Sequence, residues 1–230
     1  MAVENLVLQQ GMRDTRAALD AWRDRPWPVI RDWLIGALVV ALALLGAIYV
    51  IAKLVGPSNM PVQVPSYDPE PGDMAPVLYR NSLVLALHAM ACVAGFMARS
   101  SIPQIAEHLT GLNKWVHENA GKFAVVFVAG ATTFSLTTQA YILGGGAAIR
   151  ASEIGTSPGV LLLALTPHAI PELVALFLPL AAWLIASRRG QWNQLLAATV
   201  VTVAIAVPVL LASAAVEVYV SPRIVLSLTS

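Results

Sequence analysis

The chain has little charge and almost no cysteine. Charged residues make up 12% of its 230 residues, about half the share found in a typical soluble domain. Lysine and arginine total 14 against 13 aspartates and glutamates, so we expect no nucleic-acid partner. The single cysteine, Cys92, excludes an intramolecular disulfide. Residues 1–25 alternate arginine and aspartate without an apolar core, so we expect no cleavable signal peptide.

Enzyme motifs are also missing. The sequence contains no H-E-x-x-H, no paired-aspartate arrangement and no Ser–His arrangement that its spacing supports. The glycine run at 144–146 has no strand before it and no GK[ST] after it, so close helix packing or a helix exit explains it better than a phosphate loop. We therefore expect no catalytic residues, no metal site and no cofactor, and a protein that is not an enzyme.

What the chain does contain is long apolar segments. Hydrophobic residues make up 57% of it, and the mean hydropathy is +0.71. Five apolar segments lie at about 33–55, 77–97, 123–149, 160–186 and 195–220. Each can cross a hydrocarbon core of about 30 Å as a helix. The sequence predicts an all-α integral membrane protein, a bundle of about five transmembrane helices within a membrane domain at 33–220.

The basic residues predict the orientation. Ten of the 14 fall in the N-terminal segment and in the second-to-third and fourth-to-fifth connections, and four fall on the other side: Lys53, Arg80, Arg150 and Arg223. The positive-inside rule then places the N-terminus in the cytoplasm and the C-terminus outside. Segments 1–32 and 100–122 are predicted to be cytoplasmic, whereas the proline-rich loop 56–76 and the tail 221–230 are predicted to be extracytoplasmic.

Both cytoplasmic segments show helical amphipathic stripes. The stripe in segment 100–122 consists of Ile102, Ile105, Leu109, Leu112 and Val116, and a weaker one in segment 1–32 consists of Leu8, Met12, Leu19 and Trp22. Apolar residues at steps of three and four lie on one helix face. Such faces fit either the lipid surface, which we favour, or a partner protein.

The fourth segment carries ionisable residues deep in the predicted membrane region. His168 and Glu172 are four residues apart, so they share one helix face. Ionisable groups at this depth cost on the order of 3 kcal/mol each, and they are a functional-site hypothesis by default. Three interpretations remain open: a buried structural hydrogen bond, a proton- or substrate-handling site, and a metal site, for which two ligands on one helix are too few.

Prolines accompany this pair. Pro167, Pro171 and Pro179 each leave a backbone carbonyl without its helical donor, so we expect a kink or partial unwinding near His168 and Glu172. His88 and Gln139 reach similar depths on the second and third segments. The spacing permits a polar cluster that joins them to His168 and Glu172.

The sequence PHAIPEL, which contains this pair, resembles the central motif of the stage II sporulation protein M family, a Pro-His-Gly-x-x-Glu-Leu run. LLASAAVEVYVSP resembles the family's C-terminal end, LYRNSLVLAL the start of its second span, and LGGGAAI its glycine pairs. Ala169 replaces the usual glycine, and Pro171 is an added proline. The resemblance implies that Asn81, His168, Glu172 and Glu217 are recurring polar positions.

The resemblance also implies a multi-pass protein of a prokaryotic plasma membrane. By analogy we expect a non-enzymatic scaffold or subunit of a cell-envelope remodelling complex of the sporulation or division type. Its partners would be the bilayer and other membrane or envelope proteins, a second copy of the chain included. The alternative is a transport or channel-like module with its polar site at His168 and Glu172.

Overall fold

The computed structural model describes residues 2–57, 69–98 and 110–227, and these are almost entirely helical. The long helices are α1 (Ala2–Arg23), α2 (Trp27–Val55), α3 (Met74–Phe96), α5 (Gly111–Glu153), α6 (Pro158–Arg189) and α7 (Leu195–Tyr219). Short elements are the 3-10 turns η1 (Pro71–Asp73) and η3 (Trp192–Gln194) and the helix α8 (Ser221–Leu226). The predicted all-α bundle is confirmed.

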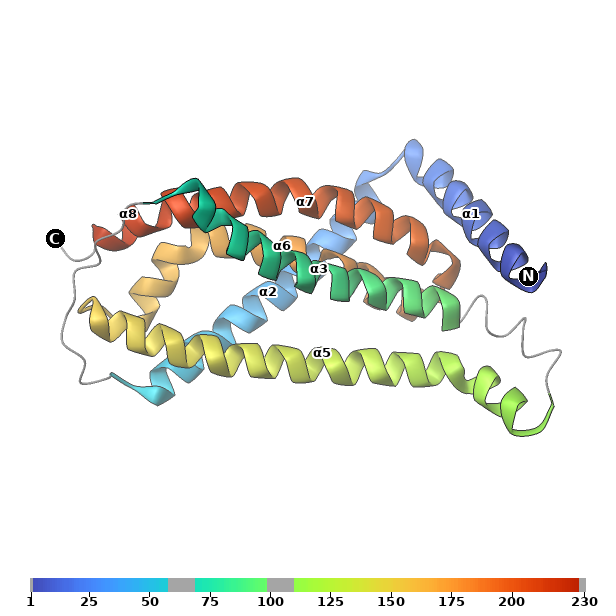
Figure 1. Cartoon of the computed structure of the whole chain (residues 1–230), viewed down its shortest axis with the longest axis horizontal. Helices are drawn as coiled ribbons and strands as arrows, with labels where there is room; N and C mark the ends of the chain where they lie inside the picture. Colours follow the sequence, from blue (N-terminus) through green and yellow to red (C-terminus); the bar gives the residue numbers. More distant parts are fainter. Residues whose placement is uncertain (1, 58–68, 99–109, 228–230) are drawn as a thin grey trace.

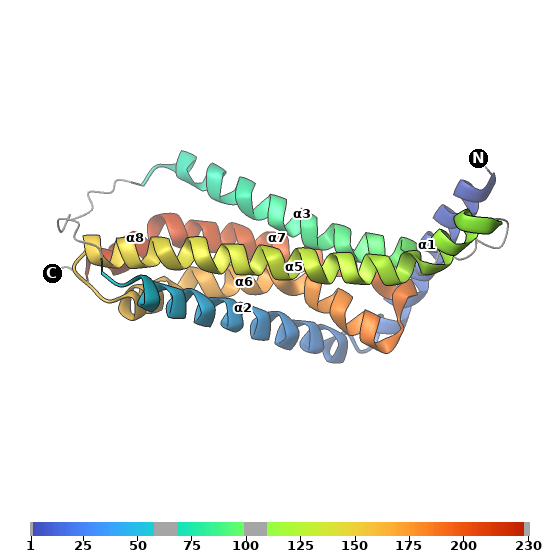
Figure 2. The same ribbon diagram turned by 90° about the horizontal axis from the view of Figure 1, so that it is seen from below.

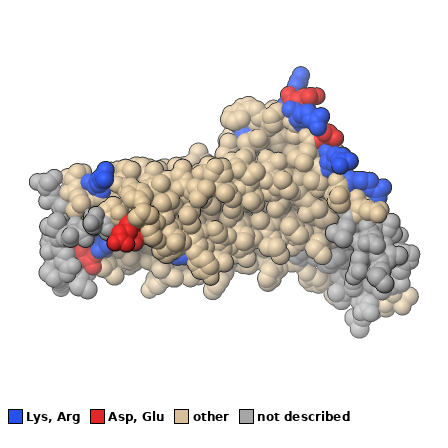
Figure 3. All heavy atoms as spheres, turned by 45° about the horizontal axis from the view of Figure 1, so that its top comes forward, with Lys and Arg blue, Asp and Glu red and all other residues tan. Residues whose placement is uncertain are grey.

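In the described part of the chain, five helical segments are long and apolar enough to cross a membrane. They are Trp27–Val55, Pro71–Phe96, Val125–Glu153, Pro158–Arg189 and Trp192–Leu226. These match the five predicted spans to within a few residues, except that the last continues through α8. Figure 3 shows charged side chains gathered at the two ends of the molecule, with a nearly uncharged belt between them. The chain is thus a multi-pass membrane protein.

The five helices run between the two ends of the molecule, and α2 crosses the others obliquely (Figures 1 and 2). The N-terminus, the start of α5 and the α6–α7 turn lie at one end, which we call the N-terminal end. The start of α3, the α5–α6 turn and the C-terminal helix α8 lie at the other end, which we call the pocket end. This arrangement keeps the predicted cytoplasmic segments together and the predicted extracytoplasmic segments together.

Helix α6 is the centre of the bundle and packs against α2, α3 and α7. Small residues permit these close contacts: a Cβ added at Gly36 of α2 would lie 3.1 Å from the Ala181 Cβ, and Ala37, Ala41 and Ala182 are fully buried. Residues 175–183 of α6 are all buried. Membrane helices associate through such small side chains, because the hydrophobic effect does not drive helices together within lipid and close packing has to do so.

Helix α6 stays helical through all three of its internal prolines. Its ribbon nevertheless bends along its length in both views (Figures 1 and 2). The expected bend is therefore present, and the expected partial unwinding is not. The Thr166 hydroxyl donates to the Leu163 carbonyl at 2.7 Å, which is the acceptor that Pro167 leaves without its backbone donor.

Helix α5 begins at Gly111, twelve residues before the predicted start of the third span at 123. The second half of predicted segment 100–122 is therefore continuous with this span rather than a separate helix. The stripe residues Ile102, Ile105 and Leu109, and the side chains of Leu112 and Val116, lie outside the described part of the chain. Over its length of 43 residues, α5 measures about 65 Å.

Helix α1 packs against α7 and η3 at the N-terminal end. The packed face contains Gly11, where an added Cβ would meet the Leu196 side chain at 3.1 Å, and the buried Ala18. Two residues of the predicted stripe lie beside it and stay outward, since Met12 is 72% and Leu19 37% exposed. Trp22 turns inward, where its ring meets Trp33 edge-on with centroids 5.3 Å apart. The side chain of the fourth stripe residue, Leu8, lies outside the described part of the chain.

Candidate functional site

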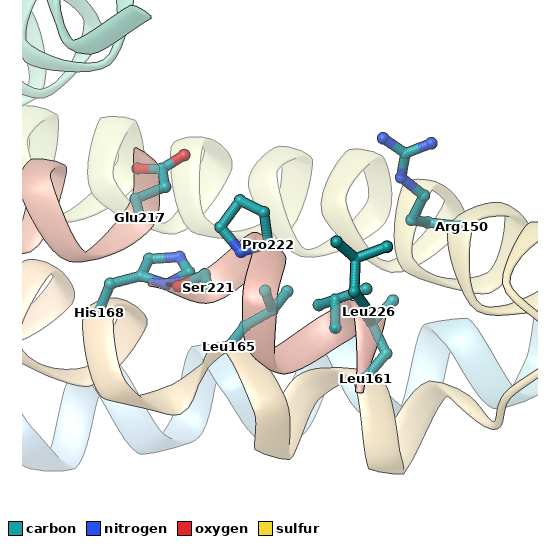
Figure 4. Close-up of a pocket in the computed structure, with 9 residues that line it drawn as sticks. Arg150, Leu161, Leu165, His168, Glu217, Ser221, Pro222 and Leu226 are labelled. Carbon is teal, nitrogen blue, oxygen red and sulfur yellow. Dashed lines mark hydrogen bonds between the residues drawn. The ribbon is translucent and has the colours of Figure 1, made fainter. Parts of the chain in front are cut away.

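His168 lies on α6 and is 9% exposed. Its Nδ1 atom lies 2.6 Å from the hydroxyl oxygen of Ser221, the first residue of α8. The Ser221 hydroxyl oxygen also lies 3.2 Å from the Val216 carbonyl oxygen. Which of the two atoms donates in the His168–Ser221 bond depends on the imidazole tautomer. This hydrogen bond fixes the imidazole ring between α6 and α8 (Figure 4).

The predicted contact between His168 and Glu172 is absent. No hydrogen bond or ion pair joins the two side chains, although both belong to the described residues. They occupy successive turns of α6, but His168 bonds to Ser221 and Glu172 is directed toward α3 and α7. His168 does make a buried hydrogen bond that joins two helices, but its partner is Ser221 of α8 and not Glu172.

Glu172 lies near polar groups from two other helices. Its carboxylate is adjacent to the Asn81 side chain on α3 and interacts electrostatically with Glu217 on α7 and with Arg80. Glu172 Oε2 and Asn81 Nδ2 are both buried and lack a partner at strict hydrogen-bond geometry, although the two side chains lie close enough to interact with each other. Polar residues at this depth in a membrane protein are a functional-site hypothesis by default.

The polar face of α3 continues toward the N-terminal end along α6. His88 donates through Nδ1 to the Leu176 carbonyl at 2.8 Å, because a carbonyl can only accept. Cys92 donates through Sγ to the Pro179 carbonyl at 3.2 Å. Both acceptors lie within one turn of each other on α6, so two side chains of α3 bind backbone carbonyls of the same part of α6.

The predicted four-residue cluster does not form. Gln139 donates to the Ser135 hydroxyl of its own helix α5 at 2.9 Å, and α5 makes only limited contact with α3 and α6. His88 belongs to the α3–α6 backbone contact instead. The residues that the structure gathers are Asn81, Glu172 and Glu217, with His168 and Ser221 at the same end of the bundle.

A pocket of about 300 Å³ lies at the pocket end between α5, α6, α7 and α8. Its polar residues are Arg150, His168, Glu217 and Ser221, and its apolar residues are Leu161, Leu165, Pro222, Val225 and Leu226. Figure 4 shows these side chains converging from several helices on one space. Arg150, at the rim, is exposed and paired with Glu153 at 2.9 Å.

The Ser221 hydroxyl is enclosed by its two partners, His168 Nδ1 and the Val216 carbonyl. Ser221 is also 3% exposed, which shields its oxygen from a substrate. Among the described residues, no group of three or more His, Cys, Asp or Glu side chains could hold a metal ion.

Two important residues escaped the sequence interpretation. Ser221 was assigned to an extracytoplasmic tail, although its spacing of four residues from Glu217 places both on one face if the helix continues. Arg80 was counted among the basic residues that predict the orientation. It acts electrostatically on both Glu217 and Glu172, and one sequence cannot reveal that α3 brings it near these residues of α6 and α7.

In comparisons with known proteins, no protein family, curated protein or solved structure matched this chain.

Proposed function

We propose that the protein is a non-enzymatic membrane subunit that assembles with other membrane proteins through helix α5. The observation that carries this proposal is the weak packing of α5 within its own chain. Only 11% of its most apolar window is buried, against 56% for α6. A spanning helix with so little internal packing has a large face left for another helix.

The composition of that face suits a protein neighbour. Its outward positions include Gly130, whose Cβ direction is open space, and Thr133 and Thr137, whose hydroxyls bond to carbonyls of their own helix at 2.8 Å. Exposed aromatic residues, Phe127, Phe134 and Tyr141, flank these small residues. Glycine and threonine favour close helix–helix contact in membranes, whereas purely lipid-facing helices need neither.

The motif resemblance supports a cell-envelope remodelling complex in a prokaryotic plasma membrane as the setting. The charge distribution supports a cytoplasmic N-terminal end, since Arg13, Arg16, Arg188 and Arg189 lie there. In this proposal the partner is a membrane protein of that complex or a second copy of this chain.

Cysteine crosslinking tests the assembly. With Cys92 replaced by alanine, a cysteine at Thr137 on α5 is compared with one at Leu42, which is 50% exposed on α2. Oxidation in native membranes should yield a discrete adduct from position 137 and none from 42. The adduct's mass separates a second copy from a different protein. Equal crosslinking at both positions, or none at 137, would contradict the proposal.

The alternative, a transport or channel-like module, is favoured by one observation: His168 lines a pocket instead of a dry helix contact. Against a continuous pathway, residues 175–180 of α6 are all buried and fill the middle of the bundle. Glu172→Gln distinguishes the two functions, since it keeps side-chain shape and removes charge. A transport module loses solute flux with normal abundance, whereas an assembly subunit retains its crosslink.

A further inference from the structure

We propose that the pocket lined by His168, Glu217 and Ser221 binds a small amphiphile with an ammonium head. The head would lie against the Glu217 carboxylate, and the hydrocarbon part would lie against Leu161, Leu165 and Val225. This inference is independent of α5 and of the assembly that α5 serves, because α5 contributes only the rim residue Arg150 to the pocket.

Charge at the site is unbalanced in favour of a cation. Glu217 is the acidic residue of the pocket lining, and it forms no ion pair within the described residues. Arg80 acts electrostatically on it, but the Arg80 side chain is exposed and donates to the Pro76 carbonyl. Glu172, outside the lining, adds a second negative charge nearby. An ammonium ion would supply the missing positive charge at a site partly removed from water.

A second polar group of the pocket is the imidazole of His168, which lines it together with Glu217. His168 is 9% exposed, and its bond to Ser221 occupies only Nδ1. Buried polar groups without partners are costly, so a bound polar head with its water would remove part of that cost.

The rest of the pocket fits a hydrocarbon body of modest size. Five of its nine lining residues are leucine, valine or proline, and its volume of about 300 Å³ is at the lower end for small-ligand sites. An anion fits less well, because Arg150 is the one basic side chain of the lining and is already paired with Glu153. The ammonium group can belong to an ethanolamine lipid or to a free amphiphilic amine.

The test uses the full chain in phosphatidylcholine nanodiscs, with octylammonium as the probe and octanol and octanoate as matched neutral and anionic probes. Isothermal titration should show octylammonium bound at least about tenfold more tightly than octanol. Glu217→Gln should weaken octylammonium about tenfold or more, as expected when a charged acceptor is lost. Glu70→Gln, an exposed carboxylate at the same end, should leave it unchanged.

A second variant tests the pocket without changing Glu217, in case Glu217→Gln protein does not fold. Leu165→Trp fills the pocket and should abolish binding of octylammonium while the protein remains monodisperse. Discs that contain phosphatidylethanolamine distinguish the two sources: competition with octylammonium identifies the lipid, and its absence identifies a free amine. Equal affinity for octylammonium and octanol, or unchanged binding in folded Glu217→Gln or Leu165→Trp protein, would overturn the proposal.

Discussion

At the scale of single residues, the site depends on which polar groups find partners across helices. His168 is satisfied through Ser221 and His88 through the Leu176 carbonyl, whereas Asn81 and Glu172 keep unpaired atoms. The satisfied residues join α6 to its neighbours and fix its position. The atoms of Asn81 and Glu172 without a hydrogen-bond partner can still bind a polar group.

The His168–Ser221 bond predicts energetic coupling between these two residues. Ser221→Ala leaves His168 Nδ1 without a hydrogen-bond partner in a buried site, so we expect a loss of about 1–3 kcal/mol in the free energy of unfolding. His168→Ala should cost a similar amount, and the double variant clearly less than the sum. Reversible unfolding in detergent measures this cycle.

The matched cycle pairs His168 with Glu172, which the structure shows to be unconnected by any hydrogen bond. Here the two alanine substitutions should add to within about 0.5 kcal/mol. Strong coupling between His168 and Glu172, with none between His168 and Ser221, would mean that the histidine bonds along α6 after all.

At the scale of the helices, the sequence predicted the five membrane spans but not which side chains of different helices lie next to one another. Apolar length and proline positions follow from local composition, so the spans and the bend of α6 could be predicted. The partner of His168 could not, because Ser221 lies 53 residues further along and the choice between it and Glu172 depends on how α8 folds back. Gln139 was placed in the cluster by depth alone, but rotation about α5 decides which way it points.

The glycine run of α5 gives a prediction with a built-in control. A Cβ at Gly144 would lie 2.7 Å from two side-chain atoms of Ile51 on α2, whereas one at the adjacent Gly145 meets nothing within 4 Å. Gly144→Ala should destabilise the protein by about 1–3 kcal/mol through overpacking. Gly145→Ala should be neutral or stabilise by up to about 1 kcal/mol, since alanine is the better helix former.

Thermal unfolding in detergent compares the two alanine variants directly. If Gly144→Ala alone lowers the melting temperature, the close packing predicted for the glycine run 144–146 is made by Gly144 alone. Similar melting temperatures for both variants would show that α2 and α5 are not in close contact at this point.

At the scale of the whole molecule, the two ends differ in charge. The N-terminal end carries most of the basic residues, and Arg189 there bonds to Asp32 at 2.8 Å, which ties the end of α6 to the start of α2. The pocket end carries the acidic cluster of Glu172 and Glu217. A bilayer with an anionic cytoplasmic leaflet favours one insertion of such a molecule over the other.

Impermeant thiol labelling of intact cells tests that orientation. In a Cys92→Ala background, cysteines at Ser157 and Glu70, both exposed at the pocket end, should react from outside. Cysteines at Asn193 and Asp24, exposed at the N-terminal end, should react only after the cells are permeabilised. The reverse pattern would invert the orientation and place the pocket on the cytoplasmic side.

The hydrogen bond between His168 and Ser221 also has a consequence for the order in which the bundle forms during synthesis. During synthesis, α6 enters the membrane before α7 and α8 have been made, so His168 lacks its hydrogen-bond partner until α8 is synthesised. Helix α8 thus completes the interior of the bundle at the pocket end. A chain truncated before residue 221 would leave His168 without this partner.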